Sequence, residues 1–127
     1  MSKTVLVVDD EEQNRKLLNA ILKRKGYNVL EAENGEIALK LIQSSAVDIV
    51  ILDIIMPGMD GYEVCDRIKT NPNTKDIPVL ILTGKGMDEG LAGAAKKKAN
   101  FYIVKPFDNN VLLAQIENML KKKEGAV

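Results

Sequence analysis

Four short apolar runs, each followed at once by a polar group, constrain the fold of this 127-residue chain more than any other feature. All four are rich in β-branched or aromatic residues and are too short for helices. Continuous apolar runs of this kind predict strands that are buried on both faces, as in a parallel sheet. A weaker fifth strand is predicted over Asn28–Ala32. The strong runs are Val5–Val8, Ile49–Leu52, Val79–Leu82 and Phe101–Val104.

Helical patterns lie between the predicted strands. Gly26 is a stop signal for the first helix, and Asn34 is a candidate N-cap for the second. The third and last helices are entered from Asp60 and Asp108. A further helix is expected within Gly84–Lys98, where several glycines predict a short or mobile element, since each costs a helix about 0.5–1 kcal/mol. Apolar residues recur at helical spacing over Leu17–Leu22, Ile37–Ile42, Val64–Ile68 and Leu112–Leu120.

Strict alternation of strands and helices predicts an α/β fold, with right-handed crossovers that place helices on both faces of a parallel sheet. For a chain of this length, the flavodoxin-like doubly wound order 2-1-3-4-5 is the natural arrangement of five strands with five helices. We expect residues 1–127 to form a single domain with a core over about 3–122.

The amino-acid composition argues against several functional classes of protein. Lysine plus arginine and aspartate plus glutamate both number 18, and this balance argues against direct binding to nucleic acid.

No apolar run approaches the roughly 20 residues of a membrane helix, and no signal-peptide pattern is present. The single cysteine, Cys65, fits a reducing compartment. We therefore expect a cytoplasmic protein without membrane contact. The chain has no histidine, which excludes histidine-based catalysis and histidine metal ligands.

Chemically useful groups follow the four strong strands. In an open parallel sheet, ligands bind outside the carboxyl ends of the strands, where the strand order reverses. Any one of these groups alone is explained equally well as an ordinary strand-end or helix-capping residue, but their repetition after four strands makes the signal specific. Three carboxylates, a hydroxyl and an ammonium are thus expected to meet in one crevice: Asp9, Asp10, Asp53, Thr83 and Lys105.

This set of groups suits phosphoryl chemistry. Three close carboxylates repel one another unless a divalent cation and the Lys105 ammonium compensate them. Oxygen ligands without a histidine or cysteine cluster favour Mg²⁺. One carboxylate can then attack phosphorus to give an acyl phosphate, while Thr83 and Lys105 bind phosphoryl oxygens. Catalysis would consist mainly of positioning and charge stabilisation.

The chain resembles the receiver domain of bacterial two-component response regulators over about Lys3–Lys122. The spacings from Asp53 to Thr83 and to Lys105 match that family. The matching motifs are Val5–Glu11, Leu52–Gly61, Ile77–Val79 leading to Thr83, and Lys105–Phe107.

The resemblance implies a role for each matching residue. Asp53 is the expected phosphoacceptor. Asp9 and Asp10 are expected to hold Mg²⁺, Asp10 more directly, together with Asp53 and the backbone carbonyl of Ile55.

Further roles follow from the other matching motifs. Thr83 and Lys105 are expected to bind the phosphoryl group. Tyr102 matches the aromatic residue that changes rotamer on activation, coupled to Thr83. Pro106 matches a proline that often follows the lysine through a cis bond.

The resemblance also implies partners. The phosphoryl donor is expected to be a phosphohistidine on a sensor histidine kinase or phosphotransfer protein. The output is expected to pass through the last two strands and helices to an unknown protein target, without direct contact to nucleic acid.

Two other functions fit the same fold. A Mg²⁺-dependent phosphohydrolase with an aspartate nucleophile would need a second acid or base and a cap domain, and neither is evident. A flavin-binding module would need a hydroxyl- and glycine-rich loop after the first strand, whereas Asp9–Glu12 is acidic and repels phosphate.

Overall fold

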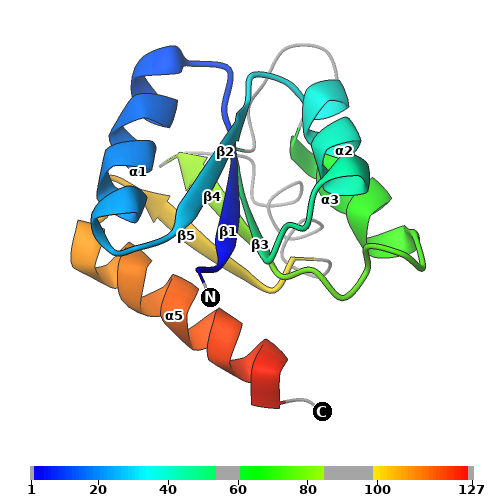
Figure 1. Cartoon of the computed structure of the whole chain (residues 1–127). Helices are drawn as coiled ribbons and strands as arrows, with labels where there is room; N and C mark the ends of the chain where they lie inside the picture. The colour runs from blue at the N-terminus through cyan, green and yellow to red at the C-terminus, as the bar shows by residue number, and fades with distance from the viewer. Residues whose placement is uncertain (1, 54–60, 85–98, 126–127) are drawn as a thin grey trace.

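The structure, a computed structural model, describes residues 2–53, 61–84 and 99–125, and this part of the chain contains five strands and four helices (Figure 1). The helix that we expect within Gly84–Lys98 falls almost wholly outside the described residues, as does Asp60. In chain order the elements are β1 (Thr4–Val8), α1 (Glu12–Arg24), β2 (Asn28–Ala32), α2 (Gly35–Ser44), β3 (Ile49–Asp53), α3 (Gly61–Thr70), β4 (Val79–Gly84), β5 (Phe101–Lys105) and α5 (Asn109–Gly125).

The five strands form one parallel sheet with the order β2-β1-β3-β4-β5, which confirms the predicted topology. The order reverses between β1 and β3, because β2 lies on one side of β1 while all later strands lie on the other. Asp53 and Lys105 are the last residues of their strands and still pair with neighbours, opposite Leu82 and Gly84. The sheet therefore holds the backbone of these two polar residues in register.

Helices cover both faces of the sheet, with α1 and α5 on one side and α2 and α3 on the other (Figure 1). Alternate residues of each strand face opposite layers. In β1, Val5 and Val7 pack in the layer of α1 and α5, whereas Leu6 and Val8 pack in the layer of α2 and α3. Burying one such side chain contributes about 1.5–3 kcal/mol, so both layers fix the position of β1.

The turn after α1 has a Schellman arrangement. The N–H of Gly26 donates to the carbonyl of Lys23 at 3.0 Å, and the N–H of Tyr27 donates to the carbonyl of Leu22 at 3.2 Å. Gly26 adopts a φ of 92°, in the left-handed region that other residues rarely enter. The predicted stop signal is thus confirmed, and its cause is this backbone conformation.

Side-chain caps begin two helices. The Asn34 carboxamide oxygen accepts a hydrogen bond from the N–H of Ile37 at 2.9 Å, which confirms Asn34 as the N-cap of α2. Asp108 precedes α5, and its carboxylate accepts from the N–H of Asn110 at 2.7 Å. Among the described helices, none is long and apolar enough to cross a membrane.

Removing the cap of α2 tests its contribution. Asn34→Ala leaves the N–H of Ile37 without its partner, and we expect the free energy of unfolding in urea to fall by about 1 kcal/mol. Asn34→Asp should retain most of the stability. The control Asn118→Ala, at an exposed position within α5, should cause no loss; a loss as large as that of Asn34→Ala would refute a specific capping effect.

The turn at Gly26 gives a second test. A Cβ added at Gly26 would meet no heavy atom within 4 Å, so substitution is opposed by backbone conformation rather than by crowding. We expect Gly26→Ala to lower the free energy of unfolding by about 1 kcal/mol, and Gly26→Asn to lower it less, since asparagine tolerates the left-handed region better. Equal losses for the two variants would contradict this explanation.

Candidate functional site

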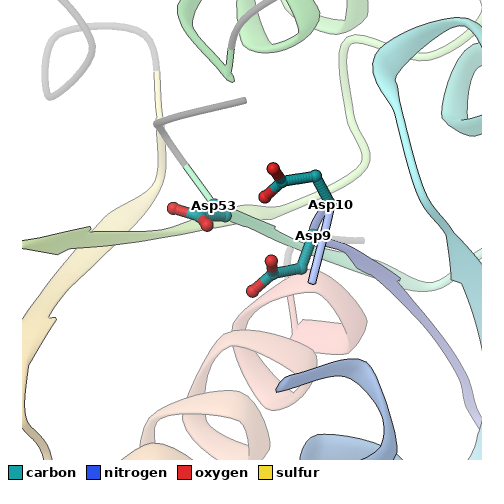
Figure 2. A group of neighbouring side chains, drawn as sticks. All are labelled: Asp9, Asp10 and Asp53. Carbon is teal, nitrogen blue, oxygen red and sulfur yellow. The ribbon is translucent and has the colours of Figure 1, made fainter. Parts of the chain in front are cut away.

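Three carboxylates gather where β1 and β3 end (Figure 2). Asp9 and Asp10 follow β1, Asp53 ends β3, and the two strands are neighbours paired through Val8 and Leu52. One oxygen from each carboxylate lies within 4.8 Å of the other two. Asp9 is buried, Asp53 is mostly buried and Asp10 is exposed, so the cluster runs from the interior to the surface. The predicted convergence of these three residues is therefore observed.

Lys105 reaches the same cluster from the far edge of the sheet. Its Nζ lies 3.7 Å from Oδ2 of Asp53, with the lysine side chain 34% and the aspartate side chain 13% exposed. Thr83 lies on β4, the strand between these two residues, and is buried. The Lys105 ammonium thus lies beside Asp53, as the sequence predicted, and Thr83 lies on the strand that pairs with β3.

Three hydrogen bonds fix the turn that carries Asp9. Its N–H donates to the carbonyl of Ala32 at 3.1 Å, and its Oδ1 accepts from the N–H of Glu11 at 2.9 Å. Its carbonyl accepts from Nη1 of Arg15 at 2.8 Å. Sequence reasoning missed Arg15, because a side chain that binds a main-chain carbonyl leaves no pattern of residue types.

The remaining predicted residues lie close to this edge or outside the described chain. Tyr102 is partly exposed on β5, and its ring stacks on that of Phe101 with centroids 6.2 Å apart. The Lys105–Pro106 peptide bond is cis, as the resemblance led us to expect. Ile55, whose carbonyl is an expected metal ligand, lies outside the described residues.

A pocket of about 350 Å³ borders the site between α1 and α5. Asp9 and Lys105 contribute to its wall on the side of the carboxylates, and Leu17 and Phe107 contribute apolar surface. Leu17 is 60% exposed, which is unusual for a leucine of a helix that packs on a core. The acidic cluster is thus next to an open, partly apolar surface.

Chemically, the arrangement combines a carboxylate nucleophile, two further carboxylates and a cation. Carboxylate oxygens are the donors that hard divalent cations prefer. The cluster contains no histidine or cysteine, and the only cysteine of the chain, Cys65, is buried in α3. The donor set therefore fits Mg²⁺ better than a softer metal.

Comparison with known proteins agrees with this geometry. The family described as the response regulator receiver domain matches residues 5–117. The phosphate regulon transcriptional regulatory protein PhoB of Pseudomonas aeruginosa is 36% identical over 96% of this chain and 53% of its own length. The response regulator PleD of Caulobacter vibrioides is 38% identical over 97% of this chain and 27% of its own length.

A solved structure extends the agreement to three dimensions. A response regulator receiver domain protein from Clostridium thermocellum superposes with a TM-score of 0.89 at 29% identity, covering 98% of this chain and 99% of its own. The chain spans about half the length of PhoB and about a quarter of PleD, so its similarity to them concerns one part of each. The matched residues, the strand order and the acidic cluster agree: this chain belongs to the response regulator receiver domain family, the phosphoacceptor signalling domains of two-component systems.

Proposed function

We propose that Asp53 is the phosphoacceptor and that Asp9, Asp10 and Asp53 bind Mg²⁺ during phosphoryl transfer. The observation that carries the proposal is the meeting of the three carboxylates within 4.8 Å, with Nζ of Lys105 3.7 Å from Asp53. The carbonyl of Ile55 is proposed as a further ligand on the strength of the sequence motif alone. When bound, the ion supplies positive charge that offsets the carboxylates and attracts a phosphoryl oxygen.

Asp53 is best placed to be the nucleophile. It sits at the end of a central strand between the other two carboxylates and Lys105, and it keeps some exposure, whereas Asp9 is buried. A carboxylate oxygen of Asp53 forms a bond to phosphorus, the bond from phosphorus to the donor imidazole breaks, and the imidazole nitrogen keeps the electron pair. The result is an acyl phosphate on Asp53.

Lys105 and Thr83 stabilise the transferred group. The Lys105 ammonium neutralises charge on one phosphoryl oxygen, and the Thr83 hydroxyl donates a hydrogen bond to another. Thr83 is held on β4, the neighbour of β3, and Lys105 is held on β5, the next strand along. Their positions are therefore set before the phosphoryl group arrives, which is the basis of electrostatic catalysis. The domain assists only its own phosphorylation and dephosphorylation.

The switch is proposed to link Thr83 to Tyr102. In the register of β4 and β5, Thr83 lies opposite Val104, and Tyr102 lies opposite Ile81. Thr83 and Tyr102 therefore face the same side of the sheet, one strand apart. When the Thr83 hydroxyl turns toward the phosphoryl group, the space beside it changes and Tyr102 moves inward. This shifts the population of two surface states formed by the last two strands and helices.

The donor is proposed to be a phosphohistidine on a sensor histidine kinase or phosphotransfer protein. The chain has no histidine of its own. The pocket is lined by the exposed Leu17 and the partly buried Phe107 and lies next to Asp9 and Lys105, which supports docking of an apolar donor surface there. The output partner is proposed to be a protein, not nucleic acid, because acidic and basic residues balance in this chain. The proposed location is the cytoplasm.

A Mg²⁺-dependent phosphohydrolase, the alternative function, is not favoured. Hydrolysis with many turnovers needs a second acid or base aimed at the leaving group. The groups that lie near Asp53 include the acidic pair that suits a metal and the Lys105 cation. The fold and the family match both agree with a receiver domain.

The phosphoacceptor can be identified directly. Incubation with acetyl phosphate and Mg²⁺ should add one phosphoryl group to the wild type by intact mass, and Asp53→Asn should add none. Chelation of Mg²⁺ should abolish the gain. If the wild type gained no phosphoryl mass, or if Asp53→Asn gained as much, the proposed role of Asp53 would be wrong. Continuous release of phosphate from many phosphate esters would instead favour the phosphohydrolase.

The role of Lys105 can be measured separately. Lys105→Met removes the cation 3.7 Å from Asp53, and we expect phosphorylation by acetyl phosphate to slow by about 100-fold, as for loss of a preorganised transition-state donor. Lys121→Met, which removes an exposed cation from α5, is the matched control and should leave the rate unchanged. Similar rates for the two variants would rule out a specific contribution from Lys105.

A further inference from the structure

Arg15 lies where α1 meets the turn that carries two of the clustered carboxylates. Its Nη1 donates to the backbone carbonyl of Asp9 at 2.8 Å, and its Nε donates to Oε1 of Glu31 on β2 at 3.3 Å. Its side chain is only 13% exposed. The planar guanidinium thus joins the turn to the edge strand of the sheet through two of its donors, a geometry that a lysine cannot reproduce.

Glu31 is itself held in place. Its Oε2 accepts from Nδ2 of Asn19 at 2.7 Å, one helical turn beyond Arg15, so both carboxylate oxygens have partners. The Glu31 side chain is 33% exposed, and its charge offsets that of Arg15. The three residues form a chain of contacts from α1 to β2, and Arg15 connects this chain to the acidic cluster at the Asp9 carbonyl.

The orientation of the Asp9 carbonyl affects the positions of both the Asp9 and the Asp10 side chains. This carbonyl belongs to the peptide group that joins Asp9 to Asp10, so fixing it fixes the plane from which both side chains leave the backbone. Three carboxylates within 4.8 Å repel one another, and the repulsion pushes this turn away from Asp53. The other two bonds of the turn hold the N–H and the side chain of Asp9, and neither restrains the carbonyl.

We propose that Arg15 is a positioning residue for the metal site, a role that rests on the proposed function above. It holds the Asp9–Asp10 peptide so that both carboxylates face Asp53, and Glu31 cancels the guanidinium charge so that it does not repel the cation. Residues that orient metal ligands typically contribute 10–100-fold to metal affinity.

The sign of the effect separates positioning from simple electrostatics. Removing a positive charge near an acidic cluster strengthens cation binding if charge alone matters. Removing a group that orients the ligands weakens it. A purely structural role would lower the melting temperature and leave Mg²⁺ affinity unchanged.

The test is the Mg²⁺ dissociation constant of the full chain by isothermal titration calorimetry. We expect Arg15→Met to weaken Mg²⁺ binding about tenfold, and Arg15→Lys to recover part of the loss, since a lysine reaches only one of the two acceptors. Arg24→Met removes the same charge from the exposed end of α1 and should not weaken binding. Unchanged or tighter binding by Arg15→Met would overturn the proposal, whatever its melting temperature in chelator.

Glu31→Gln gives an independent check. It keeps an oxygen acceptor for Arg15 but leaves the guanidinium charge uncompensated, so we expect weaker Mg²⁺ binding that recovers as salt screens the repulsion. The defect of Arg15→Met should persist at high salt, and a defect that salt removed would count against positioning. If Arg15→Met and the wild type bound Mg²⁺ equally, only this inference would fail. A wild type that bound no Mg²⁺ would overturn the proposed function as well.

Discussion

Mutual repulsion among three carboxylates is the interaction on which the rest of this structure depends. Two unit charges 4 Å apart interact with about 1 kcal/mol in water and about 4 kcal/mol near a protein surface. Asp9, Asp10 and Asp53 bring such charges together, and Asp9 is almost completely buried. The cluster is therefore stable only if the fold holds its backbone firmly and if positive charge lies close by. Lys105 supplies one such charge within the chain.

The sheet provides the necessary rigidity. β1 and β3 are central strands whose side chains are buried in both helical layers, so neither strand can move without disturbing two cores. The order of strands reverses between them, which is the place where ligands bind in open parallel sheets. The acidic cluster thus lies between the tightly packed strands β1 and β3 and an accessible surface. The thermodynamic cost of the charges is offset by packing elsewhere, which is a common feature of functional sites.

The proposed phosphoacceptor and the proposed output surface lie on different strands of the sheet. Asp53 and Thr83 lie on inner strands, whereas Tyr102 and Lys105 lie on the edge strand β5, where aromatic and aliphatic side chains remain exposed. An edge strand has one free side and fewer packing partners, so it changes its surface at lower cost. The proposed function therefore needs a fixed phosphoacceptor on β3 and a surface on β5 that can change, and the sheet provides a central strand for the first and an edge strand for the second.

The sequence alone predicted the strands, their order and the meeting of the three carboxylates, because runs such as Val5–Val8 and Ile49–Leu52 must be buried and polar groups after parallel strands meet at one edge. Its prediction that Phe101–Val104 is buried on both faces was wrong, because β5 is an edge strand on which Phe101, Tyr102 and Val104 are exposed. The sequence also determined the ends of α1 and α2, since Gly26 and Asn34 act through their own backbone neighbourhood. Only the tertiary structure showed that the Arg15 guanidinium donates a hydrogen bond to the Asp9 carbonyl. The physical reason is that every residue carries a carbonyl, so contacts to the main chain depend on where the chain passes in space and not on which residues it contains.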